Sequence, residues 1–301
     1  MVAAGRWARP RLAVPPWSSG VGLARTALAL GSAATLAATR PAVLFDPSNA
    51  GGTCGDLRAA GLFCAVPAGG GQLARWCGVL VLLVVASGWR PRVTAIPHAY
   101  ISWSLLSNAV VPDGGDQLTA ILTLLLVPMG LTDGRRWHWQ RPPETEHAIG
   151  TGRVVAGTAL ALIQIQVAVV YFQSSVAKLG VREWSDGTAM FYFLRHPLFG
   201  APPWLRPVTD TLTGAPLGVA LLTWSPLAIE LALALAILMR PRGKRVMLVT
   251  GIAFHGVIAL TMGLVSFALA MTGALLLYLL PIGTHIDVAK MIDTAEPQPA
   301  R

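Results

Sequence analysis

Residues 214–239, GAPLGVALLTWSPLAIELALALAILM, decide the fold of this 301-residue chain. The stretch carries one charged residue, Glu230, and it is long enough for a helix to cross the ~30 Å hydrocarbon core of a bilayer. The basic turn RPRGKR at 240–245 ends it, and a further apolar stretch follows. Continuous apolar blocks favour helices over barrels, whose strands alternate in polarity. The sequence therefore predicts an α-helical membrane span here.

Similar apolar blocks recur along the whole chain. Hydrophobic residues make up 54% of the sequence and charged residues 12%, about half the ~25% typical of soluble domains, and the mean hydropathy is +0.59. These values exclude a soluble globular enzyme, a disordered protein and a fibrous protein. We predict an all-α, polytopic transmembrane bundle of about eight spans, with seven to nine compatible with the pattern. The predicted spans are 20–38, 74–89, 94–111, 118–132, 154–178, 214–239, 246–262 and 264–281.

The predicted organisation is one transmembrane domain, 20–281, between an N-terminal segment, 1–19, and a polar tail, 282–301. The first span also fits a cleaved signal peptide, because basic residues precede it and small residues end it. We favour a retained helix, since the apolar stretch is long and many spans follow. Segment 179–213 mixes polar and apolar residues and is rich in proline, so it is compatible with a course along the membrane interface or with a re-entrant loop.

The net charge of +9 is explained by the placement of arginines between apolar blocks. With the N-terminus inside, the inner segments hold fifteen Lys and Arg residues and the outer segments hold seven. This asymmetry follows the positive-inside rule. We therefore predict a cell-membrane protein with both termini cytoplasmic and with no nucleic-acid partner.

The predicted topology places the 40–72 loop outside, where thiols are readily oxidised. This favours a disulfide between Cys54 and Cys64; the alternative is two unpaired thiols in a loop. Cys77, at the start of the second span, is predicted to be a buried small hydrophobe.

Lys178 is the most informative ionisable residue, because it lies at the outer end of the 154–178 span. A partly buried lysine can act as a base, and the alternative is a side chain that snorkels to the headgroups. Ser174 precedes it by four residues and shares its helix face, as in nucleophile–base pairs. Serines at such positions also bond to the backbone or to a neighbouring helix.

Two further ionisable residues lie inside predicted spans. His255 suits a proton relay or a partner site, and the alternative is a helix–helix hydrogen bond. Glu230 is expected to face the bundle interior and to pair with an arginine or a histidine.

Asp116 is expected to cap the 118–132 span, and the WHW triplet at 137–139 is expected to anchor the chain at the interface. No metal site is predicted.

Six segments, in order and at consistent spacing, resemble the SdpB family over about Gly20 to Pro281. They are GLAR at 22–25, WRPR at 89–92, HAYISWSL at 98–105, DGGDQ at 113–117, LTDGRRWHW at 131–139 and SVAKLGVREWSDGTAMFYFL at 175–194. The resemblance implies an integral membrane factor that matures a secreted antimicrobial peptide toxin. It also implies two partners, an SdpA-like protein and an SdpC-like, sporulation-delaying peptide precursor.

A wider likeness is to the HTTM (horizontally transferred transmembrane) domain, which vitamin K-dependent γ-carboxylase shares. This likeness rests on YFQSSVAKLGVREWSDG and on FHGVIALTMGLVSF. It implies that Lys178 corresponds to a catalytic base and His255 to a histidine of a later helix. The chain lacks the large extracytoplasmic domain of the carboxylase, so vitamin K chemistry is not expected, and the sequence does not identify a cofactor.

The predicted site lies at the outer ends of the spans that surround Lys178. The proposed catalytic residues are Lys178 and His255, with Ser174 as a weaker candidate; the proposed substrate-binding residues are Trp184, Asp186, Tyr171 and Glu230. Two alternatives remain. One is an HTTM-type enzyme that modifies a peptide or lipid with Lys178 as base. The other is a non-catalytic membrane scaffold.

Overall fold

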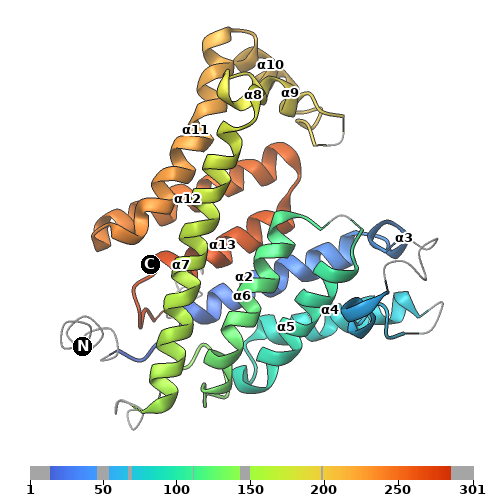
Figure 1. Cartoon of the computed structure of the whole chain (residues 1–301), viewed down its shortest axis with the longest axis vertical. Helices are drawn as coiled ribbons and strands as arrows, with labels where there is room; N and C mark the ends of the chain where they lie inside the picture. The colour runs from blue at the N-terminus through green and yellow to red at the C-terminus, as the bar shows by residue number, and fades with distance from the viewer. Residues whose placement is uncertain are drawn as a thin grey trace, which may run out of the picture.

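The computed structural model describes residues 14–45, 54–66, 70–110, 112–142, 150–197 and 199–285. Within these ranges every regular element is a helix, and no strand is present (Figure 1). The long helices are α2 (Ser19–Ala38), α4 (Gly71–Ser87), α5 (Pro91–Asn108), α6 (Gly114–Leu131), α7 (Thr151–Leu179), α11 (Pro216–Leu235), α12 (Pro241–Met262) and α13 (Val265–Leu279). The short ones are α3 (Pro41–Leu44), η2 (Asp56–Ala60), α8 (Arg182–Ser185), α9 (Ala189–Leu194), α10 (Arg206–Thr213) and η4 (Ala236–Leu238).

The predicted all-α membrane bundle is confirmed, and each of the eight predicted spans corresponds to one long helix. Five of them, α2, α6, α7, α11 with η4, and α12, are long and apolar enough to cross a bilayer. The apolar helices α4 and α13 are shorter. The predicted N-terminal segment and polar tail lie mostly outside the described residues, which begin at 14 and end at 285.

Proline and capping residues set the helix ends. Proline occupies the first turn of α5, α11 and α12, where its missing N–H removes no helical hydrogen bond. Asp113 caps α6, because its Oδ1 accepts from the Asp116 N–H at 2.7 Å. The prediction that Asp116 is the cap was therefore wrong: Asp116 lies in the first turn, and the helix begins earlier than predicted.

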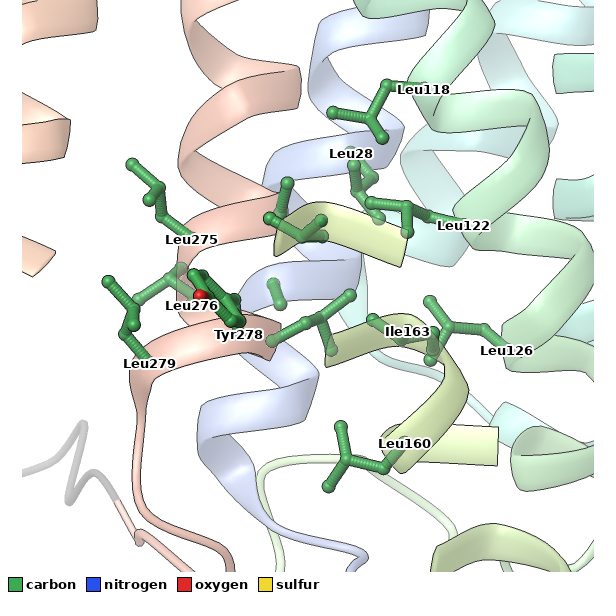
Figure 2. Packing of buried hydrophobic residues seen from close by; sticks show 14 of the residues in the cluster. Leu28, Leu118, Leu122, Leu126, Leu160, Ile163, Leu275, Leu276, Tyr278 and Leu279 are labelled. Carbon is green, nitrogen blue, oxygen red and sulfur yellow. The ribbon is translucent and has the colours of Figure 1, made fainter. Parts of the chain in front are cut away.

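The core of the bundle is built around α2 and α13, which run antiparallel with α6 and α7 packed against them (Figure 2). Small residues let the two backbones approach closely. A Cβ added at Gly273 would lie 2.9 Å from the Ala24 carbonyl oxygen, and one added at Gly31 would lie 3.0 Å from that of Ser266. Close backbone approach at small residues is the usual packing mode of helices in membranes.

Successive long helices run in opposite directions, so the turns between them gather at two ends of the bundle. The start of α2 and the end of α13 meet at one end, where the Gly20 N–H donates to the Thr284 carbonyl at 3.1 Å. This end, called the basic end, also contains the α4–α5 turn, the α6–α7 connection and the basic 240–245 turn. The opposite end, called the disulfide end, carries α3 and η2. Helices α8, α9 and α10 follow the end of α7, and Figure 1 shows them separated from α3.

One burial prediction was wrong. Cys77 on α4 is exposed at the surface of the bundle rather than buried. It belongs to the outward face of α4, which also carries the exposed Trp76 and Leu80. This apolar face points away from the helical core, in the direction where lipid surrounds a membrane bundle.

Candidate functional site

The polar centre of the candidate site is an ion pair between α7 and α11. The Nζ of Lys178 lies 2.7 Å from both carboxylate oxygens of Glu230 and 2.7 Å from the Oγ of Ser174. Ser174 reaches Lys178 because residues four apart share one face of a helix. Glu230 projects from α11, which packs along α7.

This geometry uses the whole donor capacity of the lysine. An ammonium group has three N–H donors, and three acceptors lie at 2.7 Å. The side chain of Glu230 is 9% accessible and that of Lys178 is 23% accessible. The prediction that Glu230 faces the bundle interior agrees with this burial, but the predicted arginine or histidine partner was wrong, because the partner is Lys178.

An aromatic side chain covers the ion pair. Helix α8 places the ring of Trp184 with its centroid 5.5 Å from the Nζ of Lys178, within cation–π range. The Trp224 indole N–H, from α11, donates to the Trp184 carbonyl at 3.2 Å and ties α8 to the bundle. Trp184 is therefore fixed beside the charged pair rather than free in a loop.

A cavity of about 320 Å³ lies on α8 and α9 beside Trp184. Its walls are mainly aromatic and apolar, with one carboxylate and one imidazole. The lining includes Val181, Glu183, Trp184, Tyr192, Phe193 and His196. The predicted site residue Trp184 is thus shared between the ion pair and a cavity large enough for an amino-acid side chain.

A second predicted pair lies deeper in the bundle. The Tyr171 hydroxyl and the His255 Nε2 are 2.9 Å apart, and both residues are buried. Phe254 and Phe267 surround the imidazole, with ring centroids 4.9 Å and 5.5 Å from it. Tyr171 lies seven residues, about two helical turns, before Lys178 on α7, so the two pairs follow one another along that helix.

Asp186 is engaged elsewhere. Its Oδ1 accepts from the N–H and the hydroxyl of Thr188, at 3.1 and 2.6 Å, and so stabilises the turn that leads into α9. Asp186 therefore stabilises the turn before α9 and does not contact the Lys178 ammonium. Among the residues that the structure describes, no group of three or more His, Cys, Asp or Glu side chains is arranged to hold a metal ion.

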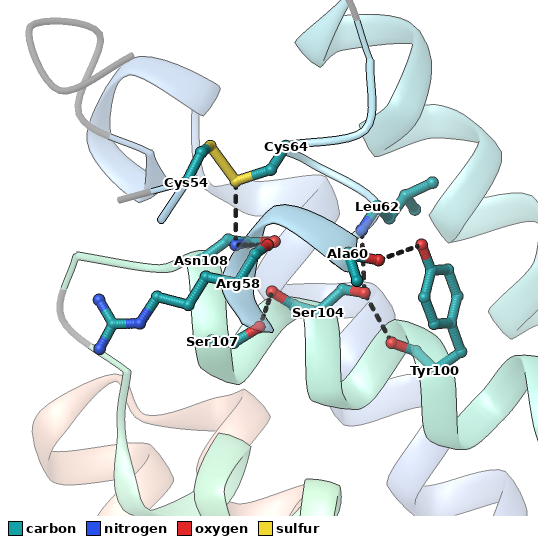
Figure 3. Close-up of a disulfide and its surroundings, with 9 residues drawn as sticks. All are labelled: Cys54, Arg58, Ala60, Leu62, Cys64, Tyr100, Ser104, Ser107 and Asn108. Carbon is teal, nitrogen blue, oxygen red and sulfur yellow. Dashed lines mark hydrogen bonds between the residues drawn. A yellow bond between two sulfur atoms is a disulfide. The ribbon is translucent and has the colours of Figure 1, made fainter. Parts of the chain in front are cut away.

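The disulfide end carries a bridge between Cys54 and Cys64, with the Cα atoms 5.5 Å apart (Figure 3). The bridge is held against α5. The Asn108 amide donates to the Sγ of Cys64 at 3.2 Å and to the Arg58 carbonyl at 3.2 Å, and the Tyr100 hydroxyl donates to the Ala60 carbonyl at 3.0 Å. These contacts fix the loop on the bundle.

A buried polar cluster that the sequence did not predict lies at the basic end. Arg25 of α2 donates to the Thr94 hydroxyl at 3.1 Å, and Arg135 pairs with Asp133 at 2.7 Å. The Arg135 guanidinium also donates to the carbonyl of His138. His138 is buried, whereas Trp137 and Trp139 on either side of it are half-buried, and the role of the WHW triplet as an interfacial anchor stays a prediction. Burial, with the nearby Arg25 and Arg135 charges, lowers the pKa of His138 to about 3. An arginine inside an apolar span was the signal for this cluster.

Comparison with known proteins gives two relatives of nearly full length. The chain is 37% identical over 281 residues to the protein YitO of Bacillus subtilis (strain 168), with 90% of this chain and 88% of YitO covered. It is 33% identical over 275 residues to the sporulation-delaying protein SdpB of the same organism, with 91% and 84% covered. No protein-family model and no solved structure matches the chain. The relation to the HTTM domain stays a prediction.

Proposed function

The chain belongs to the SdpB family, and from this membership we propose that it is a membrane maturation factor for a secreted, SdpC-like peptide toxin. An SdpA-like protein is the proposed partner. The disulfide end is proposed to face outward, where an exported precursor arrives, and both termini are proposed to be cytoplasmic. The arginine and lysine asymmetry of the sequence supports this orientation.

The observation that carries the proposal is the Lys178–Glu230 pair beside an aromatic cavity. The pair carries no net charge, and a charged group of a bound peptide would replace either of its two partners. A carboxylate of a bound peptide would take the Lys178 ammonium, and an amine would take the Glu230 carboxylate. Trp184 and its neighbours offer the rigid aromatic surface that anchors side chains in peptide and protein recognition.

The test is mass spectrometry of the secreted peptide from a host that expresses a precursor, an SdpA-like partner and this protein. Intact protein is expected to give mature peptide, and the Lys178→Ala and Glu230→Gln variants are expected to give none while remaining in the membrane fraction. Arg58→Ala is the matched control, because it removes an exposed cation of the disulfide end outside the site. Equal maturation by all variants would overturn the site, and equal maturation without the protein would overturn the function.

The enzyme alternative, with Lys178 as base, is distinguished by Lys178→Arg. The close Ser174 hydroxyl is what favours this alternative, because it resembles a nucleophile–base pair. A base must accept a proton at the Lys178 Nζ, which lies 2.7 Å from the Glu230 carboxylate oxygens and from the Ser174 hydroxyl. Arginine keeps the charge and cannot be deprotonated. Retained maturation in Lys178→Arg supports a binding role, and complete loss with an intact fold supports the base. Tolerance of every polar substitution in the bundle would indicate a scaffold.

A further inference from the structure

The basic turn between α11 and α12 concentrates charge of one sign. Residues 240–245, RPRGKR, contain four cations in six positions, and the sequence from 231 to 285 contains no acidic residue. Arg240, Arg242 and Arg245 are exposed, and Lys244 is half-buried. The turn lies at the basic end, where α12 begins, and the positive end of the α12 dipole adds to the same field.

A mostly apolar cavity of about 310 Å³ opens beside this turn. It lies between α7, the start of α12 and the end of α13. The lining includes Gln164, Met239, Lys244, Tyr278, Leu280 and Ile282. Lys244 is the cation of the turn that forms part of the wall, so charge and apolar surface meet at one place.

This combination has the chemistry of a membrane lipid. A cation at the rim suits a phosphate, and an apolar cavity between helices, where α12 enters the bundle, suits the first part of an acyl chain. Basic pockets between transmembrane helices bind anionic headgroups in this way, with ~1 kcal/mol for each Lys or Arg near the surface. A soluble anion would use the charges but would leave the apolar walls unfilled.

We infer that the cavity beside Lys244 binds an anionic phospholipid, with its phosphate at the basic turn and an acyl chain against Met239, Leu280 and Ile282. The site is separate from the Lys178 site and does not depend on the proposed function. It would hold the junction of α11 and α12 at the membrane surface, next to the 3-10 segment η4 that ends α11.

The experiment is native mass spectrometry of the purified full chain, with phosphatidylglycerol or phosphatidylcholine of the same acyl chains as probes. Wild-type protein is expected to retain phosphatidylglycerol in preference to phosphatidylcholine. The Arg242→Gln/Lys244→Gln variant is expected to bind it about 25-fold more weakly, since each cation contributes about fivefold. The Arg90→Gln/Arg92→Gln variant is the matched control, because it removes two cations from another turn of the same end.

Two outcomes overturn the inference. One is equal retention of the two lipids, and the other is equal loss of phosphatidylglycerol in both double variants, which indicates general surface attraction. Ile282→Trp fills the cavity without changing charge and is expected to reduce retention; unchanged retention in this variant contradicts the acyl-chain site. Millimolar inorganic phosphate is expected to leave the lipid bound, and its displacement would assign the site to a soluble anion.

Discussion

The ion pair between Lys178 and Glu230 is expected to show strong energetic coupling in a double-mutant cycle. Lys178→Met leaves the carboxylate of Glu230, which is 9% accessible, without a partner. Losing one partner of a buried pair costs about 3–5 kcal/mol. Glu230→Leu leaves the ammonium of Lys178, which is 23% accessible and keeps Ser174, so a smaller cost of about 2–3 kcal/mol is expected.

The double variant Lys178→Met/Glu230→Leu removes both charges and places apolar side chains in an apolar surrounding. Such replacements are often neutral or stabilising, so the expected loss is below about 1 kcal/mol. The non-additivity of the cycle is then about 4 kcal/mol or more, which is large for a contacting pair.

Thermal unfolding at pH 7 in lipid nanodiscs, followed by circular dichroism, measures the four proteins of the cycle. With roughly 3 °C for each kcal/mol, Lys178→Met is expected to lower Tm by roughly 10 °C, more than Glu230→Leu does. A double variant whose loss equals the sum of the two single losses within ~0.5 kcal/mol would refute the reasoning, because independent sites behave in that way. A larger loss in Glu230→Leu than in Lys178→Met would refute the assigned burial.

Three further predictions concern the two ends of the bundle. Under denaturing conditions, N-ethylmaleimide is expected to label one thiol, Cys77, before reduction and three thiols after it, and three labelled thiols without reductant would contradict the bridge. Replacing Cys54 and Cys64 by serine is expected to lower the unfolding free energy by about 3 kcal/mol. The native pKa of His138 is lowered to about 3, while the unfolded value is 6.5. The contribution of His138 to the unfolding free energy is therefore complete above pH 6.5 and is lost by up to about 1.4 kcal/mol per pH unit between pH 6.5 and about 3. The pH profile of His138→Asn is expected to be flatter, and equal slopes would exclude this residue as the cause. Gly88→Ala is expected to cost about 3 kcal/mol or more in thermal unfolding, because Gly88 has φ +88° and the added Cβ would overlap the His138 ring; an unchanged Tm would contradict that packing.

Local sequence patterns were sufficient for the fold class and for the positions of the helices. Apolar blocks separated by basic turns predicted eight long helices, and Pro91, Pro216 and Pro241 stand at the starts of three of them. These features depend on the side chains of one segment and on the surrounding lipid, so they can be read from the segment alone. The start of α6 was misplaced, because Asp113 and Asp116 are both capable caps and the choice depends on backbone conformation.

The ion-pair and hydrogen-bond partners that lie on different helices could not be predicted from local sequence patterns. The i, i+4 spacing placed Ser174 beside Lys178, but nothing in the local pattern distinguished a lysine from an arginine or a histidine as the partner of Glu230. The deeper hydrogen bond of Tyr171 to His255 joins residues 84 apart. Both contacts depend on which helices pack together and on their rotation.

The sequence by itself determined that this chain is an all-α membrane protein of the SdpB family, because hydropathy and motif order are properties of the linear chain. Only the tertiary structure decided that Lys178 is held by Glu230 under Trp184, that Asp186 supports a turn instead, and that Arg25 and His138 share a buried cluster. The physical reason is that a charge within an apolar bundle must find its partner on another helix, and that partner is set by packing rather than by sequence spacing.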